Sequence, residues 1–106
     1  MAWVALLIAG LLEVLWAYSM KLSEGFTKLW PSVITVAAMV ASFGLLALAM
    51  RSLPLGTAYT IWTGIGAVGA LLVGILVLGE AADAGRIIAA LLIVAGLVLM
   101  KLSSPA

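Results

Sequence analysis

Four long apolar runs, separated by short segments that hold nearly all of the charged residues, divide this chain. The runs cover residues 2–20, 31–50, 54–78 and 85–100. About 20 apolar residues in helical form cross the roughly 30 Å of hydrocarbon in a bilayer. Each run therefore predicts a transmembrane helix. The longest connection is expected at Leu22–Trp30, which is too short for a soluble domain, so residues 1–106 form a single four-helix transmembrane domain.

The composition supports a multi-pass protein of the lipid bilayer. Of 106 residues, 67% are hydrophobic and 8% are charged, and the mean hydropathy is +1.40. A soluble domain of this size could not bury so much apolar surface. The net charge of +1 provides no basic face for nucleic acid. Cysteine and histidine are both absent, so we expect no disulfide, no metal site and no cofactor.

Proline and aspartate indicate where some of the helices begin. Pro31 and Pro54 open the second and third runs, where a missing N–H does no harm in the first turn of a helix. Asp83 is suited to cap the N-terminus of the fourth helix. The sequence thus predicts three helix starts at these residues.

The basic residues are distributed almost evenly between the two ends of the predicted bundle. Four spans place both termini at one end, together with Arg51 and Lys101, whereas Lys21, Lys28 and Arg86 lie at the other. Positive residues favour the cytoplasmic side, so two against three gives almost no bias. We predict dual topology, with insertion in both orientations; the alternative is a weak signal that still yields one orientation.

Glu13 is an acid inside an apolar run rather than between runs. The first run has its midpoint near Leu11, which places Glu13 about 3 Å from it at about 1.5 Å of rise per residue. An ionisable side chain at this depth costs at least about 2.5–3.5 kcal/mol, and such residues usually mark an ion or substrate site. We predict that Glu13 binds substrate and protons. The alternative is a protonated carboxyl that only bridges helices.

Polar and aromatic residues on three of the predicted helices are expected to face Glu13 and to orient its carboxylate. They are Trp16, Ser42, Tyr59 and Trp62. An indole N–H is only a donor, so an ionised Glu13 is a natural acceptor for Trp16 and Trp62. Simpler roles stay open: either tryptophan could only pack, Tyr59 could belong to an interfacial belt, and Ser42 could bond to its own helix.

Glycines in the third run are read as packing residues rather than as a nucleotide site. Residues 64–69 spell G-x-G-x-x-G, but they lie inside a membrane helix and lack the strand–turn–helix setting of a dinucleotide site. Gly66, Ala70 and Gly74 form a strip of small residues that permits close helix contact. We expect Gly64 and Gly66 to serve packing and helix bending. A similar contact, within or between chains, is possible at Ala89, Ala90, Ala95 and Gly96.

Five motifs give the chain a specific resemblance. They are LLEVLW (11–16), SEGFT (23–27), WPS (30–32), PLGTAY (54–59) and IWTGIGA (61–67). With these motifs the whole chain resembles the small multidrug resistance family of four-helix, proton-coupled exporters. The resemblance implies an antiparallel homodimer in the cell's inner (plasma) membrane, no enzymatic activity, and one site built around both copies of Glu13. Trp16, Ser42 and the Trp62-Thr63-Gly64 motif are similar to the guanidinium-exporter subtype.

The residues and the resemblance together predict a proton-coupled antiporter of guanidinium and small guanidinyl cations. Two ionised Glu13 carboxylates in a low-dielectric crevice repel each other, so the pair can hold protons without any histidine. Guanidinium binds carboxylate oxygens through paired N–H···O bonds and competes for the same oxygens. Alternating access around this site couples the two. The main alternative is a broader multidrug exporter of quaternary ammonium or lipophilic cations; a cation channel and an accessory membrane subunit are less favoured.

Overall fold

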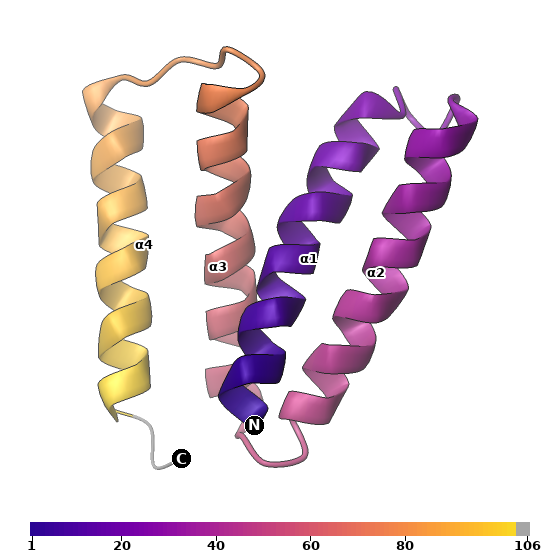
Figure 1. The fold of residues 1–106 in the computed structure, drawn as a ribbon. Helices are drawn as coiled ribbons and strands as arrows, with labels where there is room; N and C mark the ends of the chain where they lie inside the picture. The colour runs from indigo at the N-terminus through magenta and orange to yellow at the C-terminus, as the bar shows by residue number, and fades with distance from the viewer. Residues whose placement is uncertain (104–106) are drawn as a thin grey trace.

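The computed structural model describes residues 1–103, which form four long helices and no strand. The helices are α1 (Ala2–Leu22), α2 (Leu29–Ala49), α3 (Leu55–Leu76) and α4 (Ala84–Ser103). All four are long and apolar enough to cross a membrane. They stand side by side and alternate in direction (Figure 1). The predicted all-α membrane fold with four spans is confirmed.

The two ends of the bundle carry the charges that the sequence assigned to them. The N-terminus, the α2–α3 connection and the last turn of α4 lie at one end, and the other two connections lie at the opposite end (Figure 1). Arg51 and Lys101 therefore share the first end, and Lys21, Lys28 and Arg86 share the second. We refer to these as the terminal end and the loop end of the bundle. Insertion in both orientations stays a prediction.

The predicted position of the longest connection was wrong. The longest segment between described helices is 77–83, between α3 and α4, rather than the one before α2. Two causes combine. Helix α2 begins at Leu29, two residues before Pro31, which shortens the first connection. Helix α3 ends at Leu76, which lengthens the last one. Just after this end, Gly79 adopts a left-handed φ of +74°, and the N–H of Glu80 bonds to the carbonyl of Gly74 at 2.9 Å. Glycine adopts this backbone conformation without steric cost.

The predicted helix starts are close to the observed ones. Oδ1 of Asp83 accepts the N–H of Arg86 at 2.9 Å, so Asp83 caps α4 as expected. Pro54 immediately precedes α3, and Pro31 lies within the first turn of α2. Helix starts were thus readable from local signals, because capping and proline chemistry act within one turn.

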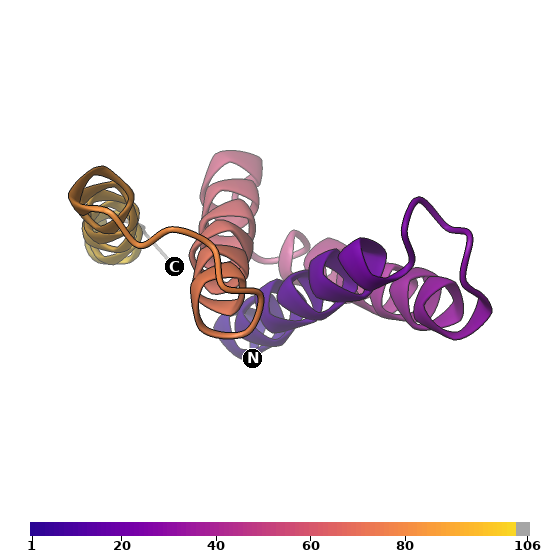
Figure 2. The same cartoon turned by 90° about the horizontal axis from the view of Figure 1, so that it is seen from above.

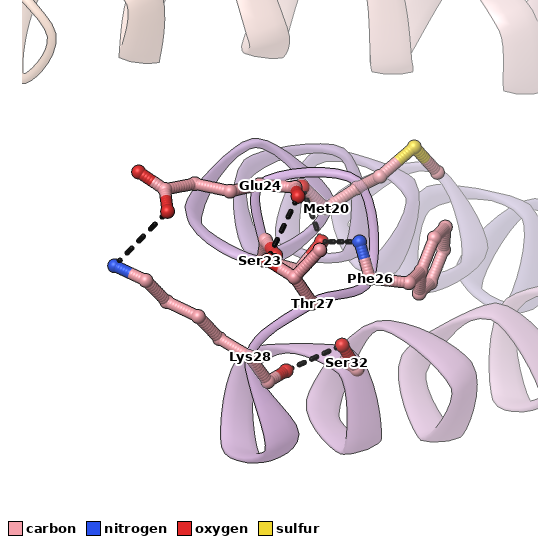
Figure 3. A network of polar contacts seen from close by, with 7 residues as sticks. All are labelled: Met20, Ser23, Glu24, Phe26, Thr27, Lys28 and Ser32. Carbon is pink, nitrogen blue, oxygen red and sulfur yellow. Dashed lines mark hydrogen bonds and ion pairs between the residues drawn. The ribbon is translucent and has the colours of Figure 1, made fainter.

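The connection between α1 and α2 is an ordered turn built on the buried hydroxyl of Ser23. This hydroxyl donates to the carbonyl of Met20 at 2.6 Å and accepts the N–H of Phe26 at 3.0 Å (Figure 3). Thr27 Oγ1 bonds to the carbonyls of Ser23 and Glu24 at 3.1 and 2.9 Å. Residues 24–26 all have positive φ, which non-glycine residues rarely adopt. The hydrogen bonds therefore hold a strained turn that returns the chain alongside α1.

The core lies toward the terminal end and is built by α1, α2, α3 and the connection between α2 and α3. Its buried members are Ala5, Leu6, Ala9, Leu46, Ala49, Leu53, Ala58, Ile61 and Trp62. Helix α1 packs against both α2 and α3, whereas α4 packs closely only against α3. Seen from above, α4 stands beyond α3, away from α1 and α2 (Figure 2). Glu13 therefore lies on the loop-end side of this core.

Glycines allow α1 and α3 to approach closely. A Cβ on Gly10 would lie 2.6 Å from Cγ2 and 2.7 Å from Cβ of Ile65, and a Cβ on Gly69 would collide with the side chain of Val14. Gly10 belongs to α1 and Gly69 to α3, so each helix supplies a glycine where the other supplies a branched side chain. Small residues at helix contacts are the usual means of close approach in membranes.

Helix α4 buries no side chain fully within the described residues. Arg86, Ala90, Ile93, Leu97 and Met100 are half-buried along one stripe, and Leu97 fills the space beside Gly64 of α3. Of the small residues expected to form a contact, Ala89, Ala95 and Gly96 are exposed, and a Cβ on Gly96 would meet no atom within 4 Å. Within residues 1–103 these three positions form no close helix contact; a contact between chains stays a prediction.

The seam between α1 and α3 predicts the effect of Gly10→Ala. The added methyl group would press on Ile65, whose β-branched side chain has little freedom to move away, so the free energy of unfolding should fall by about 1–3 kcal/mol. Reversible unfolding in mixed detergent micelles measures it. Gly44→Ala is the matched control, because a Cβ there would meet nothing within 4 Å; equal effects of the two changes would contradict the close approach at Gly10.

Candidate functional site

The carboxyl group of Glu13 rests directly on the backbone of α3. A Cβ on Gly66 would collide with Oε1 and Cδ of Glu13, so only glycine at this position leaves room for the carboxyl. Glu13 is half-buried, and its Oε1 is buried without a hydrogen-bond partner among the described residues. Gly66 thus belongs to the surroundings of the acid. Gly64, by contrast, faces α4 through Leu97 and lies outside them.

A buried hydrogen-bond chain connects three helices just below Glu13. Ser42 Oγ of α2 donates to the carbonyl of Ala9 in α1 at 2.7 Å, and Nε1 of Trp62 in α3 donates to Ser42 Oγ at 3.0 Å. A hydroxyl can donate once and still accept, so Ser42 serves both neighbours. The expectation that Trp62 donates to Glu13 was therefore wrong, and Ser42 does not bond back to its own helix.

These hydrogen bonds fix the position of Glu13 through the backbone of α1. Ala9 lies four residues before Glu13, so in an α-helix its carbonyl also accepts the N–H of Glu13. Ser42 consequently holds the turn of α1 that carries the acid, and Trp62 holds Ser42. The two residues position the acid without touching its carboxylate.

Trp16 lies one turn beyond Glu13 and presents an unused donor. Its Nε1 is buried and has no partner among the described residues, like Oε1 of Glu13. A buried polar atom without a partner costs about 1–3 kcal/mol. An unpaired donor and an unpaired acceptor on adjacent turns of α1 therefore form a place where a polar ligand or a second chain would gain hydrogen bonds.

Four aromatic rings from α1, α2 and α3 form a continuous row that begins at Trp16, one turn beyond the acid. The ring centroids of Trp16 and Phe43 are 6.3 Å apart, those of Phe43 and Trp62 are 5.8 Å apart, and those of Trp62 and Tyr59 are 5.7 Å apart. Such spacings are favourable for aromatic pairs. Phe43 was missed from the sequence, because an apolar ring in an apolar run has no contrast with its neighbours; its place next to Ser42 was the available signal.

Tyr59 is the most exposed of the predicted site residues. Its side chain is 53% exposed, and it lines a cavity of about 430 Å³ between α3 and α4 together with Thr60, Thr63 and Gly96. Tyr59 therefore reaches the site only through its ring contact with Trp62. The structure brings Glu13, Trp16, Ser42, Trp62 and Gly66 together and leaves Tyr59 and Gly64 at the side that faces α4.

The site is suited to bind a small cation. Its carboxyl group belongs to a half-buried residue and has an oxygen without a partner among the described residues, and one turn further along α1 the ring of Trp16 packs against Phe43. No group of three or more potential metal-ligating side chains occurs within residues 1–103. Carboxylates and aromatic faces both attract cations.

Comparisons with known proteins agree on one family. The model of the Small Multidrug Resistance protein family matches residues 1–93. A protein of Citrobacter freundii named Guanidinium exporter is 59% identical over 104 residues, which are 98% of this chain and 99% of the relative. Proteins with the same name from Klebsiella oxytoca and Yersinia pseudotuberculosis are also 59% identical over 104 residues, covering 99% and 100% of the relatives.

The hydrogen-bond chain predicts that Ser42→Ala is destabilising. The change leaves the N–H of Trp62 without an acceptor, so the free energy of unfolding should fall by about 1–2 kcal/mol. Trp62→Phe, which removes that donor, should cost less in the Ser42→Ala background than in the wild type. Unfolding curves in detergent micelles measure the free energy of unfolding of the single and double variants. Ser32→Ala is the control, since its hydroxyl bonds only to Lys28 of the preceding turn; additive effects of Ser42→Ala and Trp62→Phe would rule out the link.

Proposed function

The chain belongs to the small multidrug resistance family, and on that premise we propose that it exports guanidinium and small guanidinyl cations in exchange for protons. The observation that carries this proposal is the half-buried carboxyl of Glu13, which lies against Gly66 midway along a membrane-spanning helix and has a buried oxygen without a partner among the described residues. The relatives' printed name, Guanidinium exporter, supports the substrate. The four apolar spans and the family place the protein in the inner membrane as a multi-pass protein.

Competition for Glu13 provides the coupling. A guanidinium ion donates paired, charge-assisted hydrogen bonds to a carboxylate. A proton on the same carboxyl removes the charge that holds the cation. Cation and proton therefore exclude each other, and a protein that changes its access only when loaded exchanges one for the other across the membrane. This is transport, and we assign the chain no enzymatic activity.

The working unit in this proposal is an antiparallel homodimer in which two copies of Glu13 share one site. Two observations support it. In a single chain the site stays open, because Glu13 is only half-buried, and α4 buries no side chain fully over residues 84–103. In addition, the nearly even basic residues at the two ends place little electrostatic bias against either orientation.

Trp16 supports guanidinium over the alternative of a broad exporter of quaternary ammonium or lipophilic cations. In this proposal its indole ring limits the space one turn beyond Glu13, and its N–H, which has no partner among the described residues, orients the carboxylate toward a planar donor. A tetraalkylammonium ion has no N–H and needs apolar volume instead. The exposed ring of Tyr59 is the feature that favours the broader substrate range, because an aromatic face attracts any organic cation.

Glu13→Gln should abolish guanidinium transport and guanidinium-driven proton release. Removing one partner of a buried ion pair costs about 3–5 kcal/mol, or roughly 10²-fold to several thousandfold in affinity. Transport into proteoliposomes with an imposed proton gradient measures the loss. Glu24→Gln is the matched control, because Glu24 is an exposed acid of the α1–α2 connection. Proton-driven transport by Glu13→Gln at more than a few per cent of the wild type would refute the mechanism.

Trp16→Gly should shift the substrate preference toward larger cations. The KM for guanidinium should rise about 10- to 100-fold, since a hydrogen bond to a charged group contributes about 1.5–3 kcal/mol. Tetraethylammonium transport should gain from the added space. Trp16→Phe separates the two causes, because it keeps most of the ring and removes only the N–H. Transport of both cations, normalised to folded protein, is the measurement. An unchanged preference in both variants would remove Trp16 from the site.

A further inference from the structure

A second carboxylate, that of Glu80, lies against α3 near the loop end of the bundle. The carboxyl of Glu13 lies against the same helix. A Cβ on Gly74 would lie 2.7 Å from Cδ and Oε1 of Glu80 and 2.8 Å from its Oε2, and the backbone N–H of Glu80 bonds to the carbonyl of Gly74 at 2.9 Å. Both the side chain and the backbone of Glu80 are thus fastened to the last turns of α3. The acid has a defined place although it belongs to a connection.

The two acids lie along one row of small residues. Gly66, beside Glu13, and Gly74, beside Glu80, are separated by Ala70 at steps of four residues, which on an α-helix form one continuous ridge. Eight residues correspond to about 12 Å of helix. Glu80 therefore stands about two turns toward the membrane surface from the acid of the proposed transport site.

A cavity occupies the space between these two levels. It has a volume of about 150 Å³ and lies between α1 and α3. Val14, Ala17 and Ala70 line its inner part, and Tyr18, Lys21 and Glu80 line it toward the surface. Figure 1 shows α1 leaning away from α3 toward this end, which is where the cavity lies. Val14 directly follows Glu13, so the cavity extends from Glu80 to the neighbour of Glu13.

Glu80 already binds a guanidinium group, that of Arg86. The Nη2 of Arg86 donates to Oε1 of Glu80 at 3.0 Å, and both side chains are partly exposed. Arg86 is itself fixed in the first turn of α4, where its backbone N–H bonds to Asp83. The pair joins the connection after α3 to the first turn of α4, and its Glu80 lines the outer part of the cavity. A free guanidinium ion has the same donors as the group that occupies this position.

We propose that Glu80 is a surface site for guanidinium, at which the substrate replaces the side chain of Arg86 before it moves along the cavity to Glu13. The inference rests on the proposed function for its ligand. Arg86 acts as a tethered competitor, so it lowers the apparent affinity by the fraction of time that the pair is closed. Lys21, which lines the cavity together with Glu80, weakens the site further by repulsion. The site is therefore weaker than the one at Glu13 and releases its ion readily.

The test measures guanidinium binding with the inner site removed. Guanidinium chloride is titrated into purified Glu13→Gln protein in micelles, and the amide signals of residues 74–86 are followed by NMR. A saturable shift is expected, and it should disappear in Glu13→Gln/Glu80→Gln. In Glu13→Gln/Arg86→Gln the affinity should rise about three- to tenfold, as the competitor is gone. Tetramethylammonium, which has no N–H donors, should cause no such shift.

A second ion pair at the same end supplies the matched control. Lys28 and Glu24 form an exposed pair at 3.5 Å in the α1–α2 connection, so Lys28→Gln removes one positive charge from this end without touching the cavity. It should leave guanidinium binding unchanged. An equal gain from Lys28→Gln and Arg86→Gln would show a general charge effect and overturn the site. The absence of saturable binding, or binding that survives Glu80→Gln, would overturn it as well.

Transport provides an independent reading in a protein that retains Glu13. Glu80→Gln should raise the KM for guanidinium severalfold while kcat stays within twofold, because the inner site and its proton exchange are intact. An unchanged KM would overturn the role of Glu80 in loading. These results are separable from the proposed function, which fails if Glu13→Gln still transports guanidinium, whatever occurs at Glu80. Circular dichroism confirms that each variant is folded.

Discussion

The close approach of α1 to α3 is the constraint on which the rest of the structure depends. A carboxyl group in the middle of a membrane needs a place between helices, and here that place exists only because Gly66 has no side chain. The same seam repeats the arrangement on either side, with Gly10 facing Ile65 and Gly69 facing Val14. In lipid the hydrophobic effect does little to draw helices together, so close packing at small residues contributes much of the free energy of helix association. The position of the acid thus depends on the close contact between α1 and α3.

Polar groups near the seam divide into two sets with different consequences. Ser42 and Trp62 have their hydrogen bonds within the chain, and they fasten α2 and α3 to the turn below Glu13. Glu13 Oε1 and Trp16 Nε1 have no partner in the described part of the chain. Satisfied groups make the framework rigid, whereas unsatisfied ones in a low dielectric retain the capacity to bind. The arrangement separates the residues that hold the site from those that act in it.

Helix α4 is attached by one charged contact at each end and by a half-buried stripe between them. At the loop end Arg86 pairs with Glu80, and at the terminal end the ammonium of Lys101 lies 4.2 Å from the ring centroid of Trp3. Between these points its half-buried stripe meets only α3, with Leu97 beside Gly64. Most of its surface is therefore available for lipid or for a second chain. An ion pair that both secures α4 and occupies Glu80 connects the position of this helix to the outer part of the cavity.

The amino-acid sequence by itself determined the four spans, their approximate ends and the depth of Glu13. These follow from hydropathy, from the rise of a helix and from capping at Asp83, which depend on neighbours within one or two turns. Periodicity also placed Ser42 and Trp62 on helix faces that meet in the structure. Only the tertiary structure decided that Trp62 bonds to Ser42, that Ser42 bonds to Ala9, and that Gly66 rather than Gly64 receives the acid. Partner choice depends on how two helices are rotated and shifted against each other. That geometry results from packing between segments far apart in the chain, and no local pattern records it.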